Sequence, residues 1–235
     1  MDYSEVYEQV ESSTVFFSHG RRNNPYGVTL DSISTGVVVI DGFHVLTCAH
    51  CLSKNPTDIH YVISDLESNR IEQVSEFLLI DKENDIALLK FKNRVGSPVN
   101  ILSSSSVKIG KECFVVGFPN SIMQKTLLSG HIASIGENHL LLDCSVNHGN
   151  SGGPLFDPEG NLIGIINAKH GGMNAVLKDL KDNHLAKRQG GVYISGIDPL
   201  AVFNEILESM NRNLNLGIGY AVKTDVIKEK IPHLF

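Results

Sequence analysis

Short apolar runs separated by turn-forming residues dominate this chain. Valine, isoleucine, leucine and phenylalanine gather in brief stretches, with Gly, Asn, Asp and Ser between them. Many short strands with such turn signals are typical of an all-β sandwich or barrel. The predicted strands are residues 36–40, 44–47, 60–63, 77–80, 86–91, 112–116, 140–144, 162–166 and 219–222.

Two segments break the β pattern and predict helices. Residues 2–11 place Val6 and Val10 one helical repeat apart, as in a short amphipathic helix. Later, Asp198 and Pro199 form an N-cap aspartate and first-turn proline ahead of apolar residues at helical spacing. These apolar residues are Leu200, Phe203, Ile206, Leu207 and Met210. A weaker helical pattern precedes them, with Val176, Leu177, Leu180 and His184, and ends at Gly190 and Gly191.

Residues 92–106 are predicted to connect two halves of similar size. Gly96, Pro98 and the serines at 103–106 interrupt the strand pattern there, and such clusters are typical of linkers. The chain has 235 residues and 42% hydrophobic content, which is enough to build a core in one large domain or two small ones. We therefore expect a two-part β protein joined at this linker.

The net charge and the absence of targeting signals limit the kinds of partner and the compartment that we expect. The net charge is -6, and no basic stripe with interleaved aromatic residues is present, so nucleic acid is not an expected partner. The first residues lack the basic start and apolar run of a secretory signal, and no later stretch is apolar over the length of a membrane span. We predict a cytoplasmic protein with no membrane partner.

The four cysteines, Cys48, Cys51, Cys113 and Cys144, are predicted to be free thiols. Their number allows two disulfides in an oxidising compartment, but their clustering does not resemble a small secreted scaffold. Cys48 and Cys51 form a CxxC motif, which leaves a structural zinc site as an alternative. The sequence holds no second CxxC and no HxxxH to complete a tetrahedral site, so no metal and no other cofactor is predicted.

Residues 149–154, GNSGGP, carry the strongest chemical signal. Ser151 lies in a glycine-rich turn, where the backbone can take unusual angles and direct N–H groups to one point. Acyl transfer by serine needs such donors for the oxyanion, together with a base that takes the hydroxyl proton. An ordinary Gly-Ser loop is the alternative when this segment is taken alone.

His50 and Asp85 supply the other groups that nucleophilic catalysis needs. His50 sits where the apolar strand 44–47 ends, and Asp85 comes just ahead of the strand 86–91. Each has an ordinary explanation when taken alone, because this histidine is one of ten and aspartate is common in turns. Only their combination with Ser151 points to chemistry.

Taken together, these segments resemble the trypsin-like peptidases, and among them the HtrA/Deg branch. TCAHC is similar to the T-A-A-H segment around that family's catalytic histidine, NDIALLK to its aspartate segment and DCSVNHGNSGGPLF to its serine segment. The order His, Asp, Ser is also that of chymotrypsin. The resemblance covers nearly the whole chain and implies an all-β protein with two six-stranded antiparallel β-barrels of the chymotrypsin fold. It divides the chain into an N-terminal helix and barrel at 1–95, a linker at 96–106 and a C-terminal barrel at 107–235.

The resemblance also implies roles for individual residues. Ser151 is the expected nucleophile, His50 the general acid and base, and Asp85 the residue that orients the histidine. The N–H groups of Gly149 and Ser151 are the expected oxyanion hole. The expected substrate-binding residues are Ser145, His148, Asn167, Ala168, Lys169 and Ile218, with Asn167 lying against Asp85. Ser145 and Ile218 take the pocket-floor positions and neither is acidic, so we expect cleavage after small or medium uncharged residues.

Three departures from the family change the picture. No cysteine stands near Thr35 to pair with Cys51, and Asp157 stands at the counterpart of Cys113, which favours a reducing compartment. The chain ends soon after Pro232, so no PDZ domain is expected. Residues 171–215 form a helical insertion in the C-terminal barrel, next to the substrate groove. It is either a lid or a docking surface for a regulatory protein, or an inert decoration.

The predicted function is a serine endopeptidase that hydrolyses proteins or peptides through an acyl-enzyme. Two alternatives stay open: a catalytically silent binding scaffold that keeps the peptidase fold, and an esterase that uses the same triad. Intact Ser151, His50 and Asp85 argue against the scaffold. The oligomeric state also stays open, because the N-terminal aromatic residues suit either the trimer contacts of HtrA relatives or the core. These residues are Tyr3, Tyr7, Phe16 and Phe17.

Overall fold

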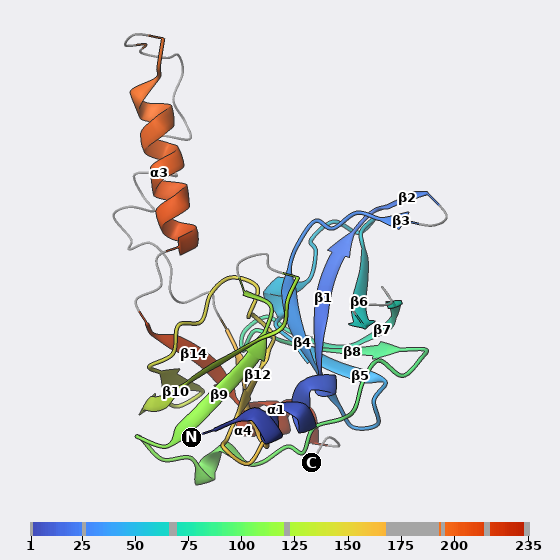
Figure 1. The fold of residues 1–235 in the computed structure, drawn as a ribbon. Helices are drawn as coiled ribbons and strands as arrows, with labels where there is room; N and C mark the ends of the chain where they lie inside the picture. The colour runs from blue at the N-terminus through green and yellow to red at the C-terminus, as the bar shows by residue number, and fades with distance from the viewer. Residues whose placement is uncertain are drawn as a thin grey trace.

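Two closed six-stranded barrels form the body of the molecule (Figure 1). The computed structural model describes residues 2–24, 27–65, 70–119, 123–167, 193, 196–213 and 217–232. In hydrogen-bonded order the first barrel contains β1 (Thr14–Gly20), β4 (Ser34–Val39), β5 (His44–Thr47), β8 (Ile86–Phe91), β7 (Arg70–Asp81) and β6 (Ile59–Asp65). The second contains β10 (Thr126–Ile135), β11 (His139–Leu142), β14 (Gly219–Lys223), β13 (Leu162–Ile166), β12 (Pro154–Phe156) and β9 (Glu112–Gly117). Their pairings are antiparallel, so the predicted fold class is confirmed.

β4 shows why short apolar runs make the barrel walls. All six of its residues are buried, and it pairs with β1 on one side and with β5 on the other. The largest apolar cluster joins both barrels, since it contains Val38 of β4 together with Phe114 and Phe156 of the second barrel. A strand that is buried on both faces has a continuous run of hydrophobic residues in its sequence, and residues 36–40 show this pattern.

The segment between the barrels is held by both of them. Val99 N–H donates to the carbonyl of Val38 at 3.1 Å, while Leu102 N–H donates to the carbonyl of Leu162 at 2.9 Å. Leu162 N–H in turn donates to the carbonyl of Asn100 at 2.8 Å. A short 3-10 helix, η3 (Ser104–Ser106), follows. The division at 96–106 stays a prediction, but the contacts show a connection fixed along its length.

The N-terminal helix α1 (Ser4–Val10) confirms the helix predicted at 2–11. It leads through η1 (Glu11–Ser13) into β1 and rests on the second barrel, where the rings of Tyr3 and Phe114 have centroids 4.9 Å apart. Phe16 and Phe17 of β1 are fully buried. These two phenylalanines therefore belong to the core of this chain.

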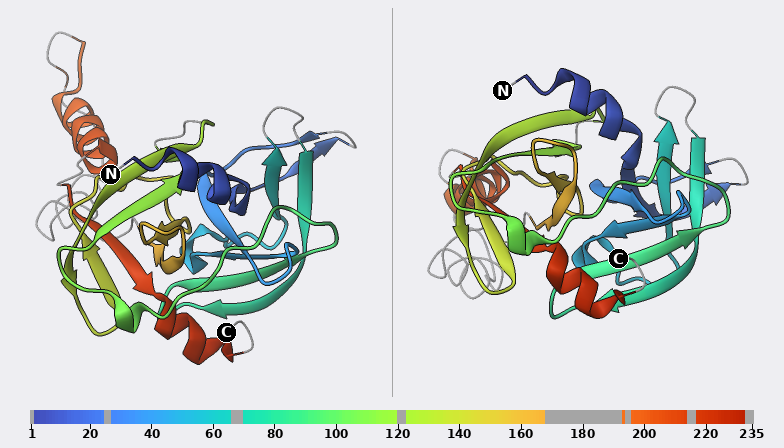
Figure 2. Two further views of the ribbon diagram at one scale, coloured as in Figure 1. Left: turned by 60° about the horizontal axis from the view of Figure 1, so that its bottom comes forward. Right: turned by 90° about the horizontal axis from the view of Figure 1, so that it is seen from below.

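The chain ends in a second packed helix, α4 (Thr224–Lys230), which follows β14 beneath the barrels (Figure 2). Its Val226 and Ile227 join the largest apolar cluster, and Lys230 lies 3.5 Å from the carboxylate of Asp81 at the end of β7. The C-terminal helix therefore ties the second barrel to the first.

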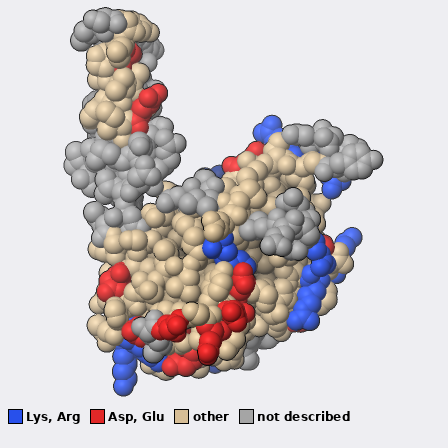
Figure 3. Space-filling view, in the orientation of Figure 1, with Lys and Arg blue, Asp and Glu red and all other residues tan. Residues whose placement is uncertain are grey.

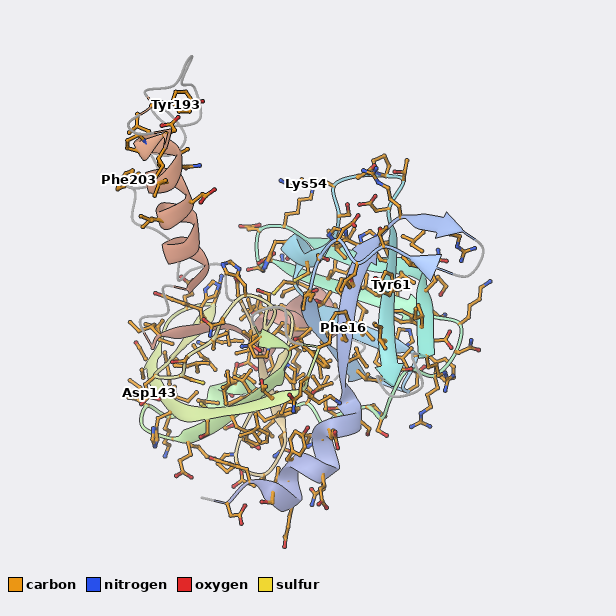
Figure 4. All side chains as sticks on the ribbon, turned by 45° about the horizontal axis from the view of Figure 1, so that its top comes forward. Phe16, Lys54, Tyr61, Asp143, Tyr193 and Phe203 are labelled. Atoms are coloured by element: carbon orange, nitrogen blue, oxygen red, sulfur yellow. The ribbon has the colours of Figure 1, made fainter. Side chains whose placement is uncertain are left out.

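Helix α3 (Pro199–Asn213) confirms the helix predicted after Asp198. The carboxylate of Asp198 accepts hydrogen bonds from the N–H groups of Leu200 and Ala201 at 3.0 and 3.3 Å, as an N-cap does. The helix stands away from the barrels, and Phe203 on it and the nearby Tyr193 are exposed (Figure 4). The weaker helical pattern at 176–184 lies outside the described residues. Whether the 171–215 insertion is a lid, a docking surface or a decoration stays a prediction.

Surface charge is unevenly spread (Figure 3). Acidic side chains gather over the end of the molecule where α1 lies. Residues 2–11, which include α1, carry Asp2, Glu5, Glu8 and Glu11. A small hairpin of β2 (Arg22–Asn24) and β3 (Gly27–Val28) extends from the first barrel. Among the described helices, none combines the length and apolar character needed to cross a bilayer.

Candidate active site

His50 and Asp85 meet at one end of the first barrel. His50 lies in a single 3-10 turn, η2 (Ala49–Cys51), directly after β5. Asp85 closes the turn between β7 and β8 with a left-handed backbone, φ 58°. Its carboxylate accepts two hydrogen bonds from His50, from the backbone N–H at 2.8 Å and at ring atom Nδ1, 2.6 Å away. The two bonds fix the orientation of the imidazole relative to its own backbone.

A third donor completes the surroundings of Asp85. Asn167, at the end of β13, donates from its side-chain amide to Asp85 Oδ2 at 2.9 Å. Its backbone N–H donates to the carbonyl of Tyr220 on β14 at 2.8 Å, which anchors it to the second barrel. The predicted contact between Asn167 and Asp85 is therefore confirmed, and it joins the two barrels at the site.

The pKa of His50 is raised from its ordinary 6.5 to about 9. Burial is the largest influence and lowers the pKa, but the hydrogen bond with Asp85 and the contact with Cys51 together outweigh it. A carboxylate that accepts the Nδ1 proton favours the imidazolium and leaves Nε2 as the atom available for proton exchange. The arrangement suits a histidine that takes up a proton during a reaction.

Ser151 lies in a buried turn bounded by glycines. Gly149 and Gly152 have φ values of 96° and 83°, which L-residues rarely adopt, and Ser151 is 5% exposed. A Cβ at Gly152 would overlap the hydroxyl of Thr47 and the carbonyl oxygen of Thr35. Glycine is therefore required at 152 both by backbone angle and by the close approach of the first barrel.

Thr35 of β4 holds this turn from the opposite barrel. Its backbone N–H donates to the carbonyl of Ser151 at 2.9 Å, and its hydroxyl donates to the carbonyl of Gly149 at 2.7 Å. The same hydroxyl accepts from the N–H of Phe118 at 3.2 Å. Sequence reasoning missed this residue, because no motif links a threonine in one barrel to a turn in the other.

The two thiols beside His50 also touch the site. Cys48 Sγ donates to the carbonyl of Ile166 at 3.1 Å, and Cys51 Sγ donates to the carbonyl of Ser151 at 3.7 Å. Their mutual hydrogen bond raises the pKa of Cys48 and lowers that of Cys51, while burial raises both pKa values. All four cysteines of the chain are buried free thiols in this structure.

The structure describes four of the six residues predicted to bind substrate. Ser145 and His148 are exposed, and Ile218 is 45% exposed. A Cβ at Gly219 would meet Val146 and the carbonyl oxygen of Cys144, so the segments that carry Ile218 and Ser145 lie side by side. Asn167 is described above, whereas Ala168 and Lys169 lie outside the described residues.

A cavity of about 880 Å³ opens beside His50 and Asp85. The loop after His50 and the outer residues of β7 line it, including Leu52, Phe77 and Ile80. The residues that line this cavity all belong to the strands and loops of the first barrel. Nothing in the sequence pattern pointed to it.

Comparison with known proteins identifies the family to which this chain is similar. Residues 34–165, more than half of the chain, match the family model described as a trypsin-like peptidase domain. A protein named "Probable periplasmic serine endoprotease DegP-like" from Hahella chejuensis is 28% identical over 84% of this chain and 44% of its own length. "Serine protease HTR4" from Bos taurus is 30% identical over 70% of this chain and 36% of its own length. "Protease Do-like 5, chloroplastic" from Arabidopsis thaliana is 28% identical over 53% of this chain and 44% of its own length.

Solved structures agree on the fold. A structure titled "HtrA-type protease AlgW with tripeptide" has a TM-score of 0.68 and 20% identity, and the match covers 99% of this chain and 63% of that one. The serine endoprotease from Yersinia pestis matches with a TM-score of 0.66 at 20% identity, over 100% of this chain and 66% of that one. The chain spans less than half the length of the three relatives described above. With its matching domain and its two barrels, the chain belongs to the trypsin-like peptidase family.

Proposed function

We propose that this chain is an HtrA-type serine endopeptidase with Ser151 as nucleophile, His50 as general acid and base, and Asp85 as the orienting carboxylate. The observation that carries the proposal is the double hydrogen bond from His50 to Asp85, at 2.8 and 2.6 Å, reinforced by Asn167. It holds the imidazole in one tautomer. Cys51, the neighbour of His50, contacts the carbonyl of Ser151, so base and nucleophile belong to adjoining turns.

In this proposal His50 takes the proton of the Ser151 hydroxyl as the oxygen attacks the scissile carbonyl. The N–H groups of Gly149 and Ser151 receive the oxyanion, and the Thr35 hydroxyl steadies their turn through the carbonyl of Gly149. His50 then gives its proton to the leaving amine, and an acyl-enzyme remains on Ser151. Water, activated by the same histidine, hydrolyses the ester.

The proposed specificity is for small or medium uncharged residues before the cut. Ser145 and Ile218 are uncharged, and a cationic substrate side chain in a dry pocket needs a carboxylate partner. Asp143, the acidic residue nearest Ser145 in sequence, is exposed and accepts hydrogen bonds from the backbone and ring of His131. This pairing supports a framework role for Asp143.

We also propose that the protein works in a reducing compartment such as the cytoplasm. Four buried free thiols support this, and a reduced Cys51 is compatible with its contact to Ser151.

Turnover of a casein substrate and of a small ester, by wild type and by Ser151→Ala, tests the proposed function. The proposal expects peptide-bond cleavage that Ser151→Ala abolishes without loss of folding. Ester turnover alone would favour the esterase alternative. A folded wild type without any turnover would favour the binding scaffold.

A further inference from the structure

Two sulfurs and one ring nitrogen come together at the base of the proposed site. The Sγ atoms of Cys48 and Cys51 and a nitrogen of His50 all lie within 4.8 Å of one another. In the described part of the chain, this is the one group of three or more His, Cys, Asp or Glu side chains close enough to share a metal ion.

Local backbone structure creates this cluster. Cys48 has extended angles, φ -80° and ψ 145°, and the chain then closes the single turn η2. The N–H of Cys51 donates to the carbonyl of Cys48 at 3.1 Å, which brings the second cysteine back beside the first. The sequence predicted only two possible ligands, the cysteines of the CxxC motif. The turn brings the imidazole of His50 to them as a third possible ligand.

The donor set matches the preferences of zinc. Zn²⁺ binds thiolate at about 2.3 Å and imidazole at about 2.0–2.1 Å, and two cysteines with one histidine and an open fourth position form a known zinc arrangement. Tetrahedral coordination at these lengths places ligand atoms about 3.5–3.8 Å apart, so movements of about 1 Å are sufficient here. The contacts that the thiols would give up are hydrogen bonds from weak S–H donors.

The cluster also has a route for entry. Cys48 and Cys51 are buried, but the side chain of His50 is 26% exposed and lines the cavity of about 880 Å³. The cavity therefore gives an ion access to the imidazole of the cluster.

We propose that Cys48, Cys51 and His50 form a zinc-binding site whose occupancy switches off the peptidase. Binding releases the two thiol protons to solvent and breaks no covalent bond between heavy atoms. Zinc at Nε2 of His50 removes the atom that accepts the serine proton, whereas zinc at Nδ1 displaces the Asp85 carboxylate. Inhibition follows in both cases, and this consequence rests on the proposed function, while the binding itself does not.

Co²⁺ titration of the phosphine-reduced full chain tests the binding independently of activity. The proposal predicts thiolate-to-cobalt charge-transfer absorption and the visible bands of tetrahedral Co²⁺ at one equivalent, both removed by added Zn²⁺. The charge-transfer absorption should be lost in both Cys48→Ala and Cys51→Ser. Cys48→Ala changes residues 47–50 to Thr-Ala-Ala-His, the T-A-A-H segment of the family that this chain resembles. The matched control Cys113→Ala removes another buried thiol and should keep it.

Peptide turnover under buffered Zn²⁺ tests the consequence. Wild type should lose turnover as zinc binds and regain it when EDTA is added. Each variant's turnover is compared with its own rate without zinc. On that scale, half-inhibition of Cys48→Ala should need a zinc concentration at least about tenfold higher than half-inhibition of wild type. Absence of charge-transfer absorption in wild type, or its survival in both cysteine variants, overturns the site. Zinc binding with undiminished turnover overturns the switch. Binding in a protein that shows no turnover even without zinc contradicts the proposed function and leaves the site intact.

Discussion

The hydroxyl of Thr35 donates a hydrogen bond to the carbonyl oxygen of Gly149 at 2.7 Å, although the two residues are 114 positions apart. The bond crosses from the first barrel to the turn that carries Ser151. Because the same hydroxyl accepts from the N–H of Phe118, one buried side chain connects three segments. The geometry of the proposed oxyanion hole thus depends on how the two barrels dock.

Replacing Thr35 with valine should therefore reduce catalysis as well as stability. Thr35→Val keeps the shape but leaves the Gly149 carbonyl and the Phe118 N–H without their partner, at a cost of about 1–3 kcal/mol in unfolding free energy. We expect kcat to fall by at least about tenfold with a smaller change in KM, since the oxyanion donors move. Ser18→Ala, which deletes a buried hydroxyl bonded to the Ser32 carbonyl, is the control that should lose stability alone. Equal kcat values for the two variants would contradict the positioning role.

Activity should rise with pH over an unusually high range. A general base must be neutral, and the pKa of His50 is raised to about 9, so kcat/KM should fall as pH drops below about 9. Asp85→Asn removes the main raising contact, and burial then shifts the pKa of His50 towards or below 6.5, with kcat reduced by about 10⁴. NMR titration of the His50 ring in Ser151→Ala and in Ser151→Ala/Asp85→Asn measures both pKa values directly. A His50 pKa at or below 6.5 with Asp85 intact would refute this electrostatic account.

Gly152 should not tolerate alanine. Gly152→Ala combines a strained φ of 83° with overlap against Thr47 and Thr35, and we expect a loss of about 2–6 kcal/mol in unfolding free energy. Gly110 has the same φ of 83°, but open space surrounds its Cβ position. Gly110→Ala therefore measures backbone strain alone and should cost about 1–3 kcal/mol. Urea unfolding of both variants separates the two contributions, and equal losses would show that the overlap relaxes freely.

Ile218 should limit the size of the residue accepted before the cut. Ile218→Gly opens the space beside Ser145, so a positional-scanning peptide library should shift from Val, Ala, Ile or Thr towards larger uncharged residues. Each methylene changes discrimination by only about 1–3 kcal/mol, so the shift should be graded. Ile109→Gly, at another exposed isoleucine, should leave the profile unchanged. A wild-type preference for Arg, Lys or an aromatic residue would overturn the pocket assignment.

The strands that the sequence predicted best are short apolar runs between turn residues. The runs at 44–47, 86–91 and 162–166 coincide with β5, β8 and β13. β10 was missed because its residues are mostly half-buried or exposed and give a weak apolar signal, and β12 because it has three residues directly behind the serine turn. β1 was missed because its apolar residues Val15, Phe16 and Phe17 follow closely on the helix predicted at 2–11, and no glycine, proline, asparagine or aspartate between them marks the start of a strand.

Within the site, local motifs predicted the chemical groups but not their supports. His50, Asp85 and Ser151 were predicted from three separate segments, whose combination and order along the chain carried the signal. The contacts of Thr35 with Gly149 and of Cys48 with Ile166 join residues more than a hundred positions apart, and they depend on how strands from two barrels face one another. Periodicity along one strand holds no information about that docking.

Covalent labelling with a fluorophosphonate probe tests the central claim most directly. Wild type should react at a single serine, and peptide mapping by mass spectrometry should find the phosphonate on Ser151. His50→Ala should react far more slowly and Ser151→Ala not at all, with both variants folded. A phosphonate on another serine, or equal labelling of wild type and Ser151→Ala, would contradict the assignment of Ser151 as the nucleophile.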